Sequence, residues 1–165
     1  LSDTRRNLRA GQYVSLIVLL DTNVLLYAID DLDLAKRDQA RAWIAACWTK
    51  RCGRISTQVL NEFYSKARRK FSSAIGAGDA RAEVRRYQHW KPWQIDHATV
   101  ETAWAIESRY GLNYWDALVV ASAQHQGCSH VITEDLQHAH QIDSVQILNP
   151  FLVGPEVLDA PGPVA

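Results

Sequence analysis

The sequence contains no methionine and only three cysteines in 165 residues. Because position 1 is Leu, we expect the start of the gene product to lie outside this sequence, and residues 1–13 are open to interpretation as a tag, an upstream extension or a genuine arm. The cysteines (Cys47, Cys52 and Cys128) are odd in number and lack C-x-x-C spacing, which argues against a disulfide framework or a zinc site. The predicted location is therefore a reducing cytoplasm.

A net charge is also absent, since 18 basic residues balance 18 acidic ones. Any affinity for nucleic acid must therefore come from local clusters of charge. No apolar run reaches the roughly 20 residues of a membrane-spanning helix, so no membrane association is expected. Arginines before the apolar run 14–20 imitate a secretory signal, but that run ends in Asp-Thr-Asn instead of a small-residue cleavage site. A secretory signal is not predicted.

The length and the 47 % apolar content are typical of one globular domain. Short aliphatic segments predict strands near 16–20, 54–56, 93–95, 131–132 and 145–148. Longer periodic or apolar segments predict helices near 23–28, 34–50, 57–71, 80–89, 97–109 and 114–126. This alternation predicts a single three-layer α/β domain, in which helices flank a mainly parallel β-sheet. The Pro- and Gly-rich residues from 149 onward are expected to fray.

Three acids stand beside the most apolar segments of the chain. Asp21 follows the first predicted strand, Asp135 follows the strand at 131–132, and Asp116 lies in a helix that is apolar almost all round. The carboxyl ends of parallel strands meet at the same edge of a sheet, where ligand sites form. We therefore expect Asp21 and Asp135 to share a site.

Each acid also has an ordinary structural explanation. Asp21 suits a turn or a helix cap, Asp116 suits the first turn of a helix, and the acids at 134–135 suit a solvated turn. Glu62 is placed to pair with Lys66 one helical turn later. The choice between these roles and a shared site depends on which cations are available.

Cations are scarce in the second half of the chain. After Lys91, Arg109 is the only lysine or arginine, so the sequence offers Asp116 and Asp135 no local salt-bridge partner. Carboxylates gathered in a site of low dielectric constant repel one another, and a divalent cation relieves that repulsion. Hard oxygen ligands favour Mg²⁺ or Mn²⁺ over zinc. Such ions hydrolyse phosphodiesters by activating a bound water, which indicates a nuclease.

Four segments occur in the order typical of one family: LLDTNVLLYA, STQVLNEFYSKARRK, GLNYWDALVVASA and VITEDLQ. Together they resemble the PIN-domain ribonucleases, and most closely the VapC-type toxins of bacterial toxin–antitoxin pairs. The resemblance spans about residues 16–150 and implies a PIN-like fold and Mg²⁺- or Mn²⁺-dependent endonucleolytic cleavage of RNA. It leaves out an N-terminal extension (residues 1–15) and a Pro/Gly-rich tail (residues 151–165).

The resemblance also implies roles for particular residues. The catalytic and metal-binding acids that it implies are Asp21, Glu62, Asp116 and Asp135. Glu134 is a less favoured claimant for the fourth place, and Asn23 and Thr133 match polar positions that support the site. Because all four acidic positions are filled, we expect an active endoribonuclease that acts as a toxin. A cognate antitoxin protein and a homodimer are the expected partners.

An RNA substrate needs cations near the acids. Lys66, Arg69 and Lys70 follow the second acid on the same predicted helix and are the expected RNA-binding residues, although most such charge runs are solvated faces. Trp90 and Trp93 are candidates for stacking on unpaired bases, against the alternative that most of the six tryptophans pack in the core.

Three other functions share parts of this pattern. A phosphorylatable receiver domain needs a lysine after a late strand, and none follows Lys91. A phosphatase with an aspartyl nucleophile usually has a second Asp two residues later, where this chain has Asn23. The third alternative is a PIN-like module that binds RNA or a protein without catalysis, and the intact set of four acids argues against it.

Overall fold

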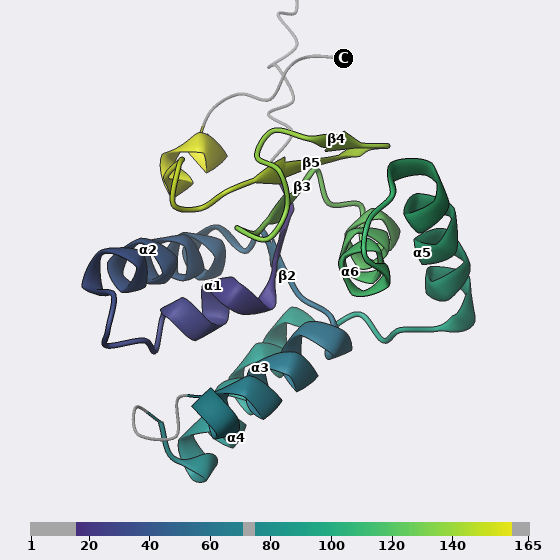
Figure 1. The fold of residues 1–165 in the computed structure, drawn as a ribbon. Helices are drawn as coiled ribbons and strands as arrows, with labels where there is room; N and C mark the ends of the chain where they lie inside the picture. Colours follow the sequence, from purple (N-terminus) through teal and green to yellow (C-terminus); the bar gives the residue numbers. More distant parts are fainter. Residues whose placement is uncertain (1–15, 71–74, 160–165) are drawn as a thin grey trace, which may run out of the picture.

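A five-stranded β-sheet lies at the centre of the molecule, which a computed structural model describes for residues 16–70 and 75–159 (Figure 1). The strands are β1 (Val18–Leu20), β2 (Gly53–Arg54), β3 (His130–Ile132), β4 (Gln141–Ile142) and β5 (Val145–Leu148). Their order is β2-β1-β3-β5-β4, and neighbouring strands are parallel except for β4 and β5. The predicted mainly parallel sheet is confirmed.

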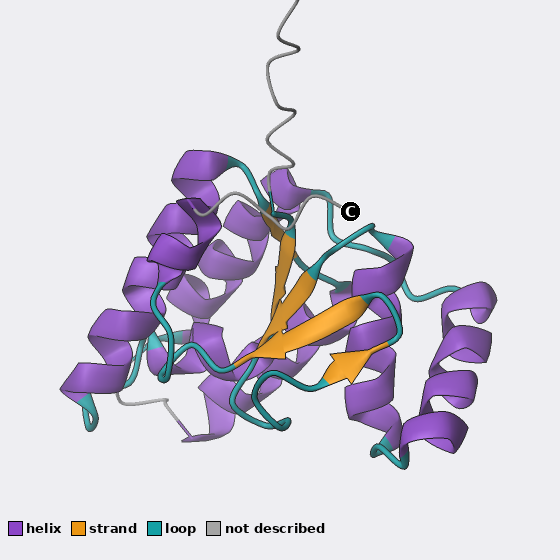
Figure 2. Ribbon diagram, turned by 90° about the horizontal axis from the view of Figure 1, so that it is seen from above, coloured by secondary structure: helices purple, strands orange, loops and turns teal. Residues whose placement is uncertain are grey.

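Helices lie on both sides of this sheet, as Figure 2 shows. They are α1 (Thr22–Tyr27), α2 (Leu34–Lys50), α3 (Thr57–Lys70), α4 (Ala77–Arg86), α5 (His97–Tyr110) and α6 (Tyr114–His125), with two 3₁₀ helices, η1 (Tyr87–Trp90) and η2 (Pro155–Asp159). In Figure 1, α1 and α2 lie to one side of the sheet and α5 and α6 to the other, while α3 packs against α1 and α4. The three-layer α/β prediction is confirmed. Among the described residues, the helices are too short or too polar for any of them to span a membrane.

The strands and the central helix are positioned by burial. Every residue of β1 is fully buried, because helices cover both faces of a parallel sheet. In α6, all residues from Ala117 to Ala123 are buried, which agrees with the prediction from its apolar sequence. The Asn113 side chain accepts a hydrogen bond from the backbone N–H of Trp115 and so caps α6. This fixes where α6 begins, about one turn before its buried stretch starts at Ala117.

Several predicted bounds are wrong. The strand expected near 54–56 is β2 and lies earlier, and the strand expected near 93–95 is reduced to a single bridge between Trp93 and Ser56. The helix expected at 80–89 is α4, which begins three residues earlier and gives way to η1. The sequence also did not predict β4, whose two residues pair with β5 as a hairpin. β2, the Trp93 bridge and β4 are too short for a hydrophobic period to locate them, whereas α4 is ten residues long and contains Gly78, a residue type that usually interrupts helices.

The chain beyond β5 does not fray as predicted, at least as far as Asp159. The indole N–H of Trp43 in α2 donates to the backbone oxygens of Pro150 and Val153, at 3.2 and 3.1 Å. Leu158 in η2 is buried. The C-terminal segment is therefore anchored to α2, whereas residues 160–165, like the predicted extension at 1–15, lie outside the described residues.

Candidate active site

Asp21 lies at the carboxyl end of β1, where the chain turns directly into α1. Its Oδ1 atom accepts a hydrogen bond from the Thr22 backbone N–H at 2.7 Å, and its Oδ2 atom accepts one from the Thr133 hydroxyl at 2.9 Å. Only 6 % of the residue is exposed. Burial raises the pKa of Asp21 to about 6, against the lowering effect of both hydrogen bonds, and Asp135 and Glu62 raise it further. A nearby positive charge would stabilise this carboxylate.

Asn23 and Thr133 connect Asp21 to Asp135. Because β1 and β3 are parallel neighbours, the residues that follow the two strands lie side by side. The Asn23 side-chain N–H₂ group lies 2.9 Å from the Thr133 hydroxyl oxygen and 3.1 Å from Asp135 Oδ2. The same hydroxyl oxygen accepts a hydrogen bond from the Asp135 backbone N–H at 3.1 Å. These contacts orient both carboxylates toward the same space.

Glu62 reaches this space from α3. Its Oε2 atom accepts a hydrogen bond from the Thr22 hydroxyl at 3.2 Å, and its Oε1 atom accepts one from the Gln58 side chain at 3.0 Å. Among the ion pairs of the described residues, none joins Glu62 to Lys66. The salt bridge that would have explained Glu62 structurally does not form.

Asp116 completes the group from the first turn of α6. Partial burial raises the pKa of Asp116, and the charges of Asp135 and Glu62 raise it further, while Lys66 lowers it. The acids thus lie close enough for their charges to act on one another, although they come from four different parts of the chain.

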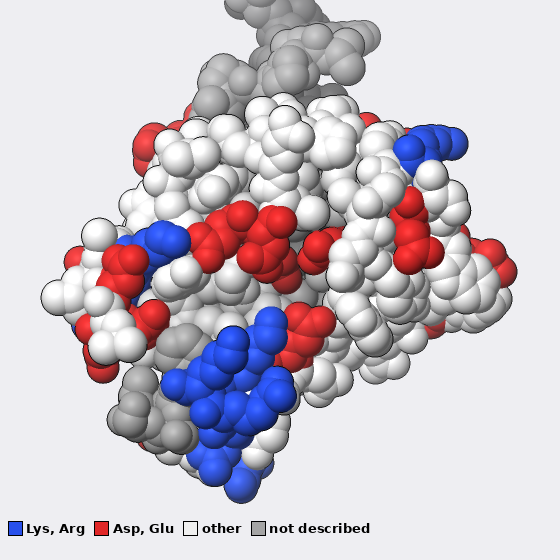
Figure 3. Space-filling model, viewed as in Figure 1, with Lys and Arg blue, Asp and Glu red and all other residues white. Residues whose placement is uncertain are grey.

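All four acids line one pocket of about 1030 Å³, whose lining also includes Asp30 and Glu134. Figure 3 shows acidic side chains as a band across this face of the molecule. Within residues 16–70 and 75–159, no three His, Cys, Asp or Glu side chains are close enough to form a preassembled metal-ligand group. The four carboxylates therefore line an open space and do not form a compact ligand cluster. Because Mg²⁺ prefers carboxylate oxygens and keeps several of its waters, this donor set fits a hydrated Mg²⁺ or Mn²⁺.

The family model of the PIN domain matches residues 18–143, more than half of the chain. The chain belongs to the PIN domain family. The match covers every predicted site residue, from Asp21 to Asp135, and ends before β5. No curated protein sequence matches the chain significantly.

Three solved structures of similar fold are a VapC toxin and two VapBC complexes. VapC20 of Mycobacterium tuberculosis, a sarcin–ricin loop cleaving toxin, is 18 % identical, with a TM-score of 0.53 over 72 % of this chain and 89 % of that chain. DNA-bound VapBC of Salmonella typhimurium is 19 % identical, with a TM-score of 0.55 over 80 % and 96 %. VapBC2 of Rickettsia felis, bound to a promoter DNA fragment, is 13 % identical, with a TM-score of 0.53 over 80 % and 97 %. At these identities the likeness shows the fold, and the predicted PIN-like fold is confirmed.

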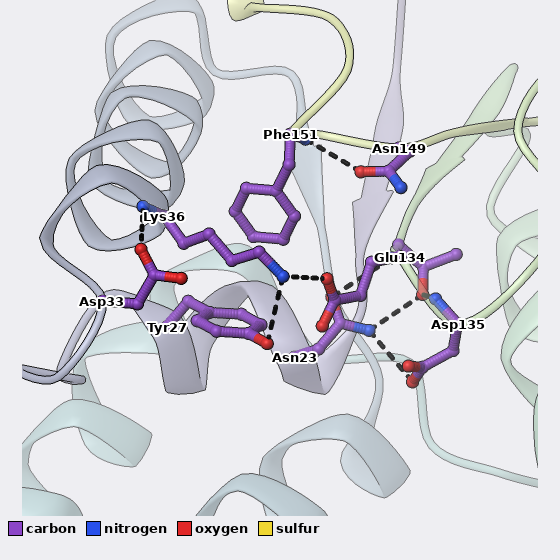
Figure 4. A network of polar contacts seen from close by, with 9 residues as sticks. Asn23, Tyr27, Asp33, Lys36, Glu134, Asp135, Asn149 and Phe151 are labelled. Atoms are coloured by element: carbon purple, nitrogen blue, oxygen red, sulfur yellow. Dashed lines mark hydrogen bonds and ion pairs between the residues drawn. The ribbon is translucent and has the colours of Figure 1, made fainter.

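Glu134, the alternative fourth acid of this PIN domain, has a partner that the sequence did not indicate. Its Oε2 atom lies 2.8 Å from the Nζ atom of Lys36, at the start of α2 (Figure 4). That ammonium group also lies 4.7 and 4.8 Å from the ring centres of Tyr27 and Phe151. Asp135 has no such cation among the described residues. The geometry therefore favours Asp135 over Glu134 as the fourth acid.

Basic side chains border the pocket of the PIN domain on the α3 side. Figure 3 shows a group of them directly below the acidic band. Of the three predicted RNA-binding residues, Lys66 and Lys70 line the pocket, whereas Arg69 is exposed and is not among the lining residues. The pocket thus presents positive charge at one border and negative charge inside.

One exposed aromatic side chain at the pocket was not predicted from the sequence. Trp115 is 58 % exposed and lines the pocket, whereas Trp90 and Trp93 do not. Trp90 instead packs with Trp48 and Tyr87, at ring-centre distances of 4.9 and 5.0 Å. The signal that could have identified Trp115 is its place directly before the third acid, on the first turn of a buried helix.

Proposed function

We propose that this PIN domain is a metal-dependent endoribonuclease, the toxin of a type II toxin–antitoxin pair. The observation that carries the proposal is the arrangement of four carboxylates around one pocket, two of which, Asp21 and Asp116, have raised pKa values. Such pKa shifts are common at functional sites, where charge is gathered for chemistry. Membership of the PIN family and the fold shared with VapC20 support the same function.

A bound Mg²⁺ or Mn²⁺ would supply an activated water and would stabilise the attacking and leaving oxygens of the phosphodiester. In this proposal Asp21, Glu62, Asp116 and Asp135 would hold the ion. Asn23 and Thr133 keep two of these carboxylates in place through the hydrogen bonds described above. The lysines at the border of the pocket bind phosphates of the strand and so place the scissile phosphate over the acids.

The wild-type protein is expected to cleave total bacterial RNA when Mn²⁺ is present and not when the ion is removed by EDTA. Asp116→Asn removes one of the four carboxylates and should lower the cleavage rate by at least about tenfold, which corresponds to about 1.4 kcal/mol of barrier. Asp38→Asn, which changes an exposed acid of α2, is the matched control and should cleave like the wild type. Equal rates for Asp116→Asn and the wild type, or cleavage by neither, would count against catalysis and favour a module that only binds.

The toxin role can be examined with the same pair of proteins, because growth arrest on induced expression in bacteria should occur with the wild type and not with Asp116→Asn.

The VapBC complexes of similar fold support a cognate antitoxin as partner, and we propose a homodimer as the assembled form. Cys47, Cys52 and Cys128 are all buried free thiols, which suits the reducing cytoplasm.

Lys66 and Lys70 are expected to contact RNA phosphates. Replacing both with Gln should weaken RNA binding and should flatten the dependence of log Kd on log salt by about 1.4, because each phosphate contact on a single strand contributes about 0.7 to that slope. Arg51→Gln with Lys91→Gln is the matched control, since it removes the same charge from a different pocket. Fluorescence anisotropy with labelled single-stranded RNA in EDTA measures both effects. The same slope in the double variant and in the wild type would rule out these contacts.

A further inference from the structure

The ammonium group of Lys36 is held in a cage of two aromatic rings and a carboxylate. Besides Glu134 Oε2 at 2.8 Å, it lies 3.4 Å from the Tyr27 hydroxyl oxygen and within 5 Å of the ring centres of Tyr27 and Phe151. Only 34 % of the Lys36 side chain and 22 % of the Glu134 side chain are exposed. Cation–π and ion-pair contacts together give this lysine a defined position (Figure 4).

The cage is itself fixed by contacts that do not involve the ammonium group. Asp33 caps the start of α2, and its Oδ1 atom accepts a hydrogen bond from the Lys36 backbone N–H at 3.1 Å. This contact fixes the backbone of Lys36. The rings of Tyr27 and Phe151 meet edge to face, with 5.0 Å between their centres. The Phe151 backbone N–H donates to Asn149 Oδ1 at 2.9 Å. Three separate parts of the chain therefore hold Lys36 in place.

Glu134 lies between two residues of the proposed active site. Thr133 and Asp135, on either side of it, both contact the Asn23 amide, and the Glu134 backbone N–H lies 3.4 Å from Asn23 Oδ1. The Glu134 side chain reaches Lys36 of α2, whereas the next side chain, Asp135, faces Asn23 (Figure 4). A free Glu134 would add a fifth carboxylate to a group whose members already repel one another.

We propose that Lys36 is a positioning residue of the nuclease site: it keeps Glu134 out of the acid group and thereby leaves Asp135 as the fourth acid. Tyr27 and Phe151 contribute by holding its ammonium group. Lys36 lies at the outer side of Glu134 and acts only through that residue. The kinetic part of this inference rests on the proposed endoribonuclease function, whereas the structural part does not.

The first experiment needs neither metal nor RNA. In Lys36→Met, which keeps the chain length and removes the charge, the NMR signals of the Asn23 side-chain N–H₂ group and of the Asp135 backbone amide should shift. Lys50→Met is the matched control, because Lys50 lies on the same helix and pairs with Asp159 away from the site. It should leave both signals unchanged. Unchanged signals in Lys36→Met would overturn the inference even if the protein cleaves RNA.

The second experiment measures cleavage and ion binding. Lys36→Met should lower kcat by about 10- to 100-fold with little change in KM, as expected when a reacting group is displaced by about 1 Å. Mn²⁺ should bind the RNA-free variant more tightly than the wild type, because Glu134 is freed to join the acids. Adding Glu134→Gln to Lys36→Met should reverse both changes, which a loss of folded protein cannot do. A double variant that stays as slow as Lys36→Met would contradict the inference.

The two proposals fail in different ways. If the wild type cleaves no RNA but Lys36→Met still shifts the Asn23 and Asp135 signals, the endoribonuclease function is wrong and the positioning role stands. If the wild type cleaves RNA and Lys36→Met matches Lys50→Met in signals, kcat and Mn²⁺ affinity, the function stands and the positioning role is wrong.

Discussion

Asp21→Asn is expected to abolish RNA cleavage and, in the metal-free protein, to increase stability at neutral pH. The loss of cleavage should reach about a thousandfold, because metal-assisted stabilisation of the transition state is worth several kcal/mol and Asp21 is the buried member of the acid group. The gain in stability arises because the ionised Asp21 carboxylate is buried without a cation. Its neutral replacement keeps the shape and avoids that penalty.

The pH dependence of this gain follows from the pKa of Asp21. Burial raises it from 3.8 to about 6 in the folded protein, so the folded state binds more protons than the unfolded state between these values. Stability conferred at this position is therefore highest below about pH 4, falls as the pH rises toward 6, and stays low above it. Asp21→Asn should thus stabilise the protein by about 1–2 kcal/mol at pH 7.5, after allowance for weaker hydrogen bonding to Thr133, and much less at pH 4.

Urea unfolding in EDTA at pH 4, 5.5 and 7.5 measures this difference, with Asp38→Asn as the exposed-acid control. Mn²⁺ should then stabilise the wild type at pH 7.5 and leave Asp21→Asn almost unchanged, because a ligand stabilises only the state that binds it. An Asp21→Asn protein that is less stable than the wild type at pH 7.5, or equally active, would refute this account of the site.

Of the proposed variants, Trp43→Ala should cause the largest loss in the free energy of unfolding. The expected loss is about 3–5 kcal/mol, as is typical for truncation of a fully buried tryptophan. Trp43 is 0 % exposed and its indole N–H donates to two backbone oxygens of the segment that follows β5. The substitution therefore leaves a cavity beside α2. It also removes the two hydrogen bonds that hold the segment that carries Phe151. Trp43→Phe keeps most of the ring and should lose about 1–2 kcal/mol, mainly from the missing hydrogen bonds.

Trp104→Ala is the matched control for Trp43→Ala, since Trp104 is 46 % exposed on α5 and its truncation should change stability by less than about 0.5 kcal/mol. Chemical denaturation at one pH compares the three variants with the wild type. A Trp43→Ala protein that unfolds at the same urea concentration as Trp104→Ala would show that the C-terminal segment is not anchored through this indole.

Most of the helices and the proximity of Asp21 to Asp135 could be predicted from local patterns, whereas the places of Glu62 and Asp116 in the same group were implied by the resemblance to PIN-domain ribonucleases. The bounds predicted for α2 and β5 agree with the structure to the residue. The proximity of Asp21 and Asp135 followed from a rule about parallel strands, and the register of β1 with β3 satisfies it. Predictions of this kind need only the chain near each residue and the class of the sheet.

The partners of the acids could not be predicted, because they come from distant parts of the chain. Lys36 lies 98 positions before Glu134, and no spacing rule connects them. Phe151, which completes the cage, belongs to a segment whose Pro and Gly content predicted fraying. That segment is held in place by the hydrogen bonds from the Trp43 indole to Pro150 and Val153. Arg69 lies at helical spacing with Lys66 and Lys70, yet only the two lysines line the pocket.

The pairing of β1 with β3 also sets the order in which the molecule can assemble during synthesis. Val18 of β1 pairs with His130 of β3. More than a hundred residues must therefore be added after β1 before β3 leaves the ribosome and can pair with it. Until then Asp21 has neither Thr133 nor Asp135 beside it, and the Lys36 cage lacks Phe151. A nascent chain therefore carries an incomplete pocket until the residues from β3 to Phe151 have been made.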